Sequence, residues 1–373
     1  MNVLFRVDAS ILIGSGHVMR CLTLANALSS NNWVCSFICY PHRGNLIKQI
    51  EDSGYQVFSS KAFQNEKEVL RVGGSTRYSG WLGQGADDDA SLSIDVMRSF
   101  ERNIAKINWL VVDHYAIDNY WERKLLLFVD NILVIDDLAN RNHICDILLD
   151  QTFGREPKEY TSHVTPSCEM LLGSKYALLR PEFAALREYS LNRRNVPKLE
   201  KLLVTLGGVD KDNVTALVLK ALDSCQLPEN CQVVVVMGAK APWLDDVKNI
   251  INSMKIPVEL MVNVKNMAQI MSECDLCIGA AGSTSWERCC LGVPTISMQL
   301  AENQQTILSN LEKIKATLVI KNTDSDTVRK ELTNILMKIT KDVSCLNELI
   351  RQASSVTDGK GAERVVQIME RCT

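Results

Sequence analysis

The sequence has no excess of positive charge and no long apolar run. Its 373 residues include 41 Lys+Arg and 44 Asp+Glu, a formal net charge of −3. Broad binding to nucleic acid or to an anionic membrane surface needs clustered basic residues, so neither is an expected partner. No apolar run approaches the roughly 18 residues of a membrane span. Arg6 and Asp8 lie where a signal peptide would continue its apolar core, so we expect a cytoplasmic protein.

Cysteine, by contrast, is plentiful, but its pattern does not favour disulfide bonds. The 13 cysteines are odd in number and scattered through apolar segments, which is typical of reduced core residues. Cys274 and Cys277 form a single CxxC pair with no second pair nearby, so neither zinc binding nor redox chemistry is indicated. With 46% apolar residues, the chain is long enough for two domains with full cores.

Short apolar segments alternate with segments of helical periodicity through most of the chain. This pattern is typical of strand–helix–strand units on parallel sheets. The expected strands are residues 2–7, 34–40, 109–112, 131–135, 201–206, 231–237, 257–261, 275–278 and 295–298. The expected helices are residues 17–30, 90–104, 119–128, 213–224, 243–253, 267–273 and 284–291. The fold class is therefore α/β, with two Rossmann-like, doubly wound domains that face a cleft.

A polar segment containing Pro181 and Pro197 divides the two series of strands, and we interpret it as a connector. The expected organisation is an N-terminal domain over residues 1–180, a linker over 181–199, a C-terminal domain over 200–345 and a helical tail over 346–373 that packs back on the first domain. Residues 73–89 are rich in glycine and aspartate and fit neither strand nor helix. Both domains open with a strand, a glycine-rich turn and a helix, and ligands bind at such turns.

The first of these turns, residues 13–21, contains Gly14, Ser15, Gly16 and His17. Glycines let a backbone approach a ligand, and the free amides of a first helical turn favour an anion. A dinucleotide loop is one interpretation, although Met19 occupies the place of the third glycine of that motif. The alternative is that His17 itself is functional, because a helix N-terminus favours a neutral imidazole that can accept a proton as a general base.

In the second half, the small residues before Glu287 repeat this arrangement. Gly282, Ser283 and Thr284 begin a helix and are suited to hold a diphosphate without a metal, while Glu287 lies one turn further on and is placed to reach ribose hydroxyls. An ordinary helix cap formed by Ser283 is the simpler alternative. Polar residues follow the next strand as Glu302-Asn303-Gln304, suited either to sugar hydroxyls and N-acyl groups or to capping a helix.

Carboxylates also gather after two strands of the first half. Asp113 and His114 follow one strand, and Asp136 and Asp137 follow another, which would suit a magnesium-dependent phosphotransferase. Paired aspartates at strand ends equally serve to fix loops. We expect no metal and no cofactor.

Several of these motifs occur in the order found in one known family. The residues that carry the likeness are 6–10, 14–21, 112–115, 136–141, 180–183, 282–290 and 301–304. Over residues 1–305 the chain resembles the UDP-sugar hydrolases of bacterial pseudaminic acid biosynthesis. That family is similar in fold to two-domain glycosyltransferases of the MurG kind, the GT-B type, in which the C-terminal domain holds the nucleotide.

The resemblance implies hydrolysis of UDP-2,4-diacetamido-2,4,6-trideoxy-β-L-altropyranose, with inversion and without a metal. It implies that His17 is catalytic and that Tyr78 and Asn303 belong to the active site. The full expected substrate site is Gly14, Ser15, Gly16, Arg20, Tyr78, Asp113, His114, Glu302, Asn303 and Gln304. The expected UDP site is Gly207, Gly208, Gly238, Gly282, Ser283, Thr284 and Glu287. A UDP-sugar-dependent glycosyltransferase and a non-catalytic nucleotide-sugar binding protein are the alternatives.

Overall fold

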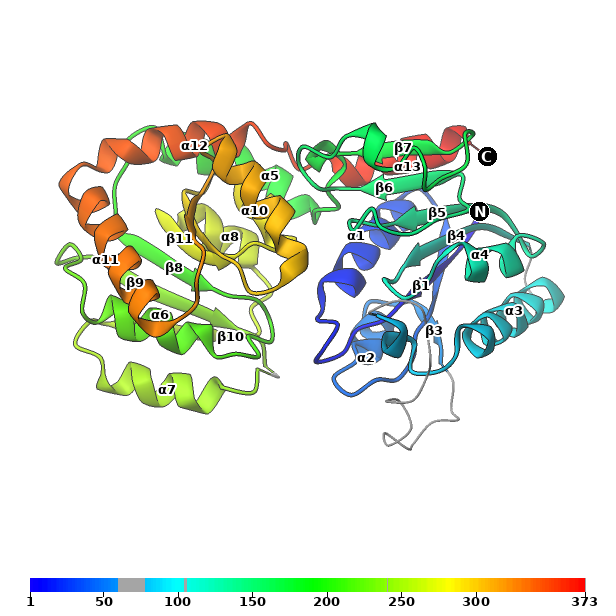
Figure 1. Ribbon diagram of the computed structural model, residues 1–373, viewed down its shortest axis with the longest axis horizontal. Coiled ribbons are helices and arrows are strands. Elements are labelled where there is room, and N and C mark those ends of the chain that lie inside the picture. The colour runs from blue at the N-terminus through cyan, green and yellow to red at the C-terminus, as the bar shows by residue number, and fades with distance from the viewer. Residues whose placement is uncertain (60–77, 104–105, 240, 373) are drawn as a thin grey trace. The chain divides into compact units, whose positions relative to one another are not determined.

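The computed structural model describes residues 1–59, 78–103, 106–239 and 241–372. The chain divides into two compact units (Figure 1): Met1–Leu178 with Gly361–Thr373, and Leu179–Lys360. The segment 73–89, whose role the sequence leaves open, is described only from Tyr78 onward, and residues 73–77 lie outside the described residues. In the described part of the chain, no helix has both the length and the apolar character needed to cross a membrane.

The first unit is built on a seven-stranded sheet with the order β3-β2-β1-β4-β5-β6-β7. Its strands are β1 (Asn2–Val7), β2 (Val34–Ile38), β3 (Gln56–Phe58), β4 (Ile107–Asp113), β5 (Val129–Ile135), β6 (Ile147–Asp150) and β7 (Glu169–Leu172). Every pair of neighbours is parallel. Because β1 lies between β2 and β4, the chain direction across the sheet reverses there, and ligands of doubly wound sheets bind at that reversal.

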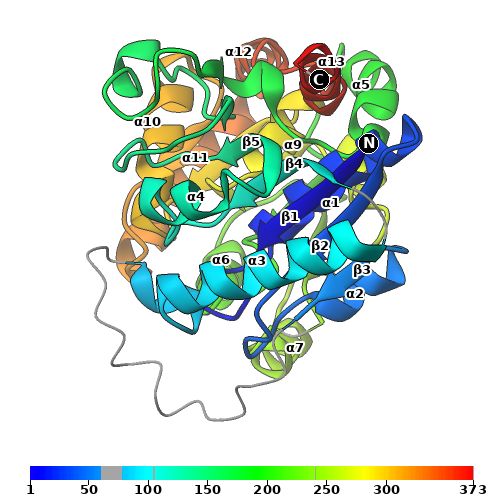
Figure 2. The same ribbon diagram turned by 90° about the vertical axis from the view of Figure 1, so that its right-hand side faces the viewer.

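Helices cover both faces of this sheet (Figure 2). They are α1 (Gly16–Ser30), α2 (Ile47–Asp52), α3 (Ala86–Asn103), α4 (Asn119–Leu125) and α13 (Gly361–Arg371), with the short 3₁₀ turns η2 (Ser79–Leu82), η3 (Pro157–Glu159) and η4 (Ser174–Tyr176). Successive residues of β1 point to opposite faces, so Val3 and Phe5 join the core under α1 and α13, whereas Leu4 joins the core under α3 and α4.

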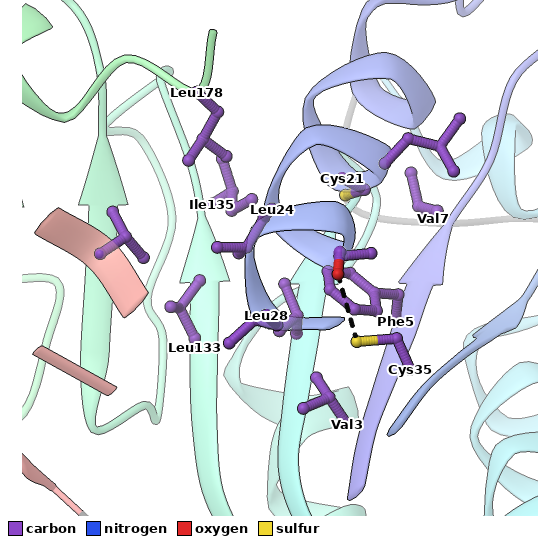
Figure 3. Packing of buried hydrophobic residues seen from close by; sticks show 14 of the residues in the cluster. Val3, Phe5, Val7, Cys21, Leu24, Leu28, Cys35, Leu133, Ile135 and Leu178 are labelled. Atoms are coloured by element: carbon purple, nitrogen blue, oxygen red, sulfur yellow. Dashed lines mark hydrogen bonds between the residues drawn. The ribbon is translucent and has the colours of Figure 1, made fainter. Parts of the chain in front are cut away.

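Helix α1 is held on the sheet by its apolar side. Figure 3 shows Leu24 and Leu28 of α1 beside Phe5 of β1 and Leu133 of β5, all of them buried. Burying a leucine side chain contributes about 1.5–3 kcal/mol. This packing keeps the first turn of α1, which carries His17, at the carboxyl end of β1.

The second unit repeats the topology with a six-stranded parallel sheet of order β10-β9-β8-β11-β12-β13. Its strands are β8 (Lys201–Thr205), β9 (Gln232–Met237), β10 (Val258–Val262), β11 (Leu276–Ala280), β12 (Thr295–Met298) and β13 (Leu318–Ile320). Its helices are α5 (Pro181–Arg193), α6 (Val214–Leu222), α7 (Leu244–Ser253), α8 (Met267–Glu273), α9 (Thr284–Cys290), α10 (Gln305–Lys313), α11 (Ser325–Lys341) and α12 (Leu346–Ser354), with η5 (Glu302–Gln304) and η6 (Val343–Cys345).

The segment 181–199 differs from the expected connector. Pro181 is the first residue of α5, a position where its missing N–H costs no hydrogen bond, and α5 packs on α8 within the second unit. Arg194, from the polar run that suggested a linker, is buried and donates to the carbonyls of Met271 and Cys274 at the end of α8. The tail 346–373 also divides, because α12 belongs to the second unit and α13 to the first.

Candidate active site

In the first unit, two predicted site residues meet at the carboxyl ends of β1 and β4. His17 follows β1 in the first turn of α1, and Asp113 is the last residue of β4. The loop between β1 and α1 is shaped by Gly14, whose φ of 83° favours glycine and whose N–H donates to the Ser10 carbonyl. Ser15 and Gly16 are half-buried beside it.

His17 and Asp113 form a hydrogen-bonded dyad. The Nδ1 atom of His17 lies 2.6 Å from Oδ1 of Asp113. An ionised carboxylate can only accept, so Nδ1 carries a proton, and Nε2 is the ring nitrogen left to exchange a proton with a substrate. The His17 side chain is 10% exposed and the Asp113 side chain is fully buried, so the imidazole is the end of the dyad that a substrate can reach.

Arg20, one turn further along α1, holds the same carboxylate from the other side. Its Nε and Nη2 atoms lie 2.6 Å from Oδ2 and Oδ1 of Asp113, a bidentate ion pair. Burial raises the pKa of the Asp113 carboxyl, but Arg20 and His17 outweigh burial and the pKa lies below its usual range. Asp113 therefore stays ionised. Nη1 of Arg20 also binds Asp137 at 3.0 Å.

Aromatic rings surround the dyad. The Tyr115 ring lies 4.7 Å from the His17 ring, and its hydroxyl donates to Asp137. Trp81, from η2, stacks on Tyr115 with ring centroids 5.5 Å apart, and Tyr78 contacts both rings at 4.8 and 5.2 Å. The predicted site residue Tyr78 therefore lies near His17, because the rings of Tyr115 and Trp81 contact both side chains.

His114, also predicted to bind substrate, is enclosed by protein. It is 3% exposed, its Nδ1 accepts the N–H of Ala116, and its Nε2 lies 3.3 Å from the buried Asp8 carboxylate. Burial lowers the pKa of His114, so this ring is neutral near pH 7. Its contact with the dyad runs through the ring of Trp81, 6.5 Å away.

The carboxylates that suggested a metal are instead bound by arginines. Asp113 pairs with Arg20 as described, and Asp136 lies 2.8 Å from Nη2 of Arg141. Asp137 is shared between Arg20 and Tyr115. Among the residues that the structure describes, no group of three His, Cys, Asp or Glu side chains is arranged to hold a metal ion.

In the second unit, the glycines predicted to bind UDP lie close together at the ends of β8 and β9. Gly207 has a φ of 98°, a conformation that favours glycine. A Cβ atom at Gly238 would lie only 2.2 Å from the Gly208 carbonyl oxygen, so no side chain fits between these two backbones. The sheet edge here is therefore lined by backbone.

The small-residue turn after β11 continues the same edge. Gly282 has open space around its Cα, with Nε2 of Gln304 the nearest atom at 3.7 Å from an added Cβ. Ser283 precedes α9 but makes no side-chain capping hydrogen bond, which argues against the simple helix-cap interpretation. Gln304 itself accepts the N–H of Leu300 and is held beside the turn. Glu302 and Asn303 lie next to it in η5 and are exposed.

The side chain of Arg288 in α9 binds this turn through hydrogen bonds. Its guanidinium is buried and donates to the Ala280 carbonyl at 2.7 Å and to the hydroxyls of Thr284 and Ser285 at 3.1 Å. Burial raises the pKa of the neighbouring Glu287 to about 7, against the opposing charges of Arg180 and Arg288. Glu287 is therefore ionised only in part at neutral pH.

Sequence reasoning missed several residues that complete these sites. Trp81, Tyr115 and Asp137 stand around the dyad, and Arg288 stands under the second turn. In the sequence, Asp137 stands out only in the carboxylate pair that would suit magnesium, and Tyr115 only among the residues that carry the family likeness. No periodicity or spacing in the sequence indicates that Arg288 bends back over Gly279, where an added Cβ would lie 2.6 Å from its Nη1.

Two doubly wound parallel sheets with polar turns at their central carboxyl edges define a two-domain, Rossmann-like protein of the GT-B fold. MurG of Acinetobacter baumannii has this fold and superposes with a TM-score of 0.68 over 99% of both chains, at 15% sequence identity. The model of the glycosyltransferase family 28 C-terminal domain matches residues 201–365.

Two relatives cover most of the chain. The UDP-2,4-diacetamido-2,4,6-trideoxy-β-L-altropyranose hydrolase of Campylobacter jejuni is 26% identical over 84% of this chain and 97% of its own length. The uncharacterised protein MJ1062 of Methanocaldococcus jannaschii is 26% identical over 85% of this chain. This chain spans only 60% of the length of MJ1062.

Proposed function

We propose that the protein is a UDP-sugar hydrolase that cleaves the anomeric C–O bond of UDP-2,4-diacetamido-2,4,6-trideoxy-β-L-altropyranose, releasing UDP and the free sugar. The observation that carries the proposal is the His17–Asp113 dyad at the topological switch of the first sheet. The similarity to the Campylobacter jejuni hydrolase supports the choice of substrate.

In this reaction His17 is the general base. Nε2 takes a proton from water as the water oxygen bonds to the anomeric carbon, and the bond from that carbon to the phosphate oxygen breaks with its electrons leaving on UDP. Attack opposite the leaving group inverts the configuration. The ionised Asp113, fixed by Arg20, keeps the proton on Nδ1 and stabilises the imidazolium that forms.

The second unit holds UDP in this proposal. Gly282, Ser283 and Thr284 offer backbone N–H groups and two hydroxyls to the diphosphate, and Gly207, Gly208 and Gly238 let the nucleotide approach the backbone. Glu287 accepts hydrogen bonds from the ribose hydroxyls. Asn303 contacts the sugar, as the family resemblance implies, and Glu302 beside it binds sugar hydroxyls.

A glycosyltransferase is the second candidate, and one observation favours it. The model of the glycosyltransferase family 28 C-terminal domain matches residues 201–365. The same dyad would then deprotonate the hydroxyl of an acceptor instead of water. This alternative predicts that UDP is released slowly from the donor alone and rapidly once an acceptor is added.

An NMR time course separates the two candidates. The purified protein is incubated with the UDP-sugar alone, and with UDP-N-acetylglucosamine as a matched nucleotide sugar. A hydrolase releases UDP and the inverted free sugar from the first donor without any acceptor. A transferase consumes the donor only slowly in the absence of an acceptor, and a non-catalytic binding protein shifts the donor signals without turnover.

A further inference from the structure

Trp81 is a partly exposed indole beside the dyad, and its surroundings point to a ligand. It belongs to η2 and contacts the rings of His17 at 6.4 Å and His114 at 6.5 Å, both edge to face. The stacked Tyr115 ring, inclined by only 22°, covers one face of the indole. The remainder of Trp81 is partly exposed, although its neighbours Leu82 and Tyr115 are buried.

The position of Trp81 is fixed from both sides. The backbone N–H of Trp81 donates to the Tyr78 carbonyl at 2.8 Å. Gly83, two residues later, has a φ of 70° and lies against Tyr40, where an added Cβ would come within 2.4 Å of the ring. The indole stacks on Tyr115, whose hydroxyl donates to Asp137, and Asp137 in turn pairs with Arg20. These contacts hold the indole at a set distance from the dyad.

The indole N–H of Trp81 adds a polar group to this partly exposed surface. Nε1 of Trp121 donates to Asp89 at 3.0 Å and Nε1 of Trp243 donates to the Lys211 carbonyl at 2.7 Å. No residue in the described ranges accepts a hydrogen bond from Nε1 of Trp81. A tryptophan that offers both apolar surface and an unused donor suits a group with the complementary pair, a methyl and a carbonyl oxygen.

Resting on the proposed function, we infer that Trp81 is a specificity-determining residue that binds an acylamino substituent of the sugar. The indole surface packs on the acyl methyl, and Nε1–H donates to the acyl carbonyl oxygen. The hydroxyl of a plain hexose offers no methyl for this surface, so the contact selects acylamino sugars over hydroxylated ones at the step of binding.

Calorimetry in a His17→Asn background, which we expect to bind substrate while turning it over at least about 10²-fold more slowly, tests the inference. Trp81→Phe keeps a ring but loses the donor, and Trp81→Ala loses both. We expect affinity for the diacetamido UDP-sugar to fall about threefold and about tenfold respectively, with affinity for UDP changed less than twofold. Trp243→Phe, at an exposed tryptophan whose indole N–H donates to a backbone carbonyl, is the control and should leave both affinities unchanged.

The outcomes are distinguishable. If the His17→Asn parent binds UDP but not the UDP-sugar, the proposed function fails and the inference falls with it. If the parent binds the UDP-sugar and both Trp81 variants bind it equally well, the inference alone is overturned. A parallel loss of UDP affinity in the Trp81 variants would also overturn it, because UDP carries no acylamino group.

Discussion

The two units share a topology but differ in the side chains at their central sheet edges. In both sheets the first strand lies between the second strand and the fourth strand of the series, β4 or β11, and a glycine-containing turn follows that first strand. The edge of the first unit carries charged side chains joined by hydrogen bonds of 2.6–3.0 Å, from His17 through Asp113 and Arg20 to Asp137. The edge of the second unit carries glycines and hydroxyls.

The shared topology gives both units a central sheet edge with a polar turn, and the different residue types suit the two edges to different tasks. An ordered ionic network can move a proton at a defined atom, but it leaves few N–H groups for an anion. A turn of small residues offers backbone N–H groups to an anion but carries no side chain that readily accepts a proton. We therefore assign chemistry to the first unit and nucleotide binding to the second, and the predictions below test that division.

The largest expected effect is on turnover in His17→Asn. Asparagine keeps a polar group but cannot take a full proton, so kcat should fall about 10²-fold or more while the Kd for UDP stays within twofold. His163→Asn, a second partly exposed histidine of the first unit, is the control and should retain wild-type kcat. Near-normal turnover in His17→Asn would contradict the assignment of chemistry to the first unit, because His17 would not be the base.

The variant Gly282→Asp tests the assignment of nucleotide binding to the second unit. The added side chain has room, since Gln304 is the nearest atom at 3.7 Å, but its charge would lie beside the diphosphate. We expect UDP affinity to fall at least tenfold, with an unchanged circular dichroism spectrum. Asn252→Asp, an exposed residue of α7, introduces the same charge elsewhere and should bind UDP normally. Tight UDP binding by folded Gly282→Asp would contradict the assignment.

Glu287 should make nucleotide binding depend on pH. Its pKa of about 7 means that the carboxyl is protonated below pH 6 and ionised above pH 8. An ionised carboxylate accepts stronger hydrogen bonds from ribose hydroxyls, so affinity for the UDP-sugar should rise roughly fivefold from pH 6 to pH 8. Calorimetry should find this rise absent in Glu287→Gln. A rise of equal size in the Gln variant would mean that another group titrates.

The smallest expected effect is that of a chelator. Because arginines neutralise Asp113, Asp136 and Asp137, turnover of the UDP-sugar should be unchanged by excess EDTA. The assay is the same NMR time course, with and without chelator. If EDTA abolished turnover and magnesium restored it, these carboxylates would have a catalytic role as metal ligands. The diphosphate would then bind at the first unit.

Much of the fold could be predicted from the sequence because long apolar strands and amphipathic helices are local patterns. Strands β1 and β12 and helix α8 have the expected bounds. Strands β3, β6, β7 and β13 were not predicted: they have three or four residues each, and among strands this short only β12, between Pro294 and a polar cluster, was predicted. The connector expected over 181–199 was wrong at α5, where Pro181 begins a helix instead of ending one.

The candidate site was predictable only in part. The turn that bears His17 is a local signal, but its partner Asp113 lies 96 residues away and joins it only because β1 and β4 are neighbours in the sheet. Trp81 lies just after the undescribed residues 60–77, and its contact with Tyr115, which follows β4, brings it beside the dyad. Contacts of this kind depend on tertiary packing, which no motif records.

The central claim is that water attacks the anomeric carbon, and the oxygen isotope in the released UDP tests it most directly. The enzyme is incubated with the UDP-sugar in H₂¹⁸O without acceptor, and the mass of the UDP is measured. Attack at the sugar carbon leaves the phosphate oxygens untouched, so the account predicts unlabelled UDP together with free sugar. UDP carrying one ¹⁸O, or no release of UDP in the absence of an acceptor, would contradict it.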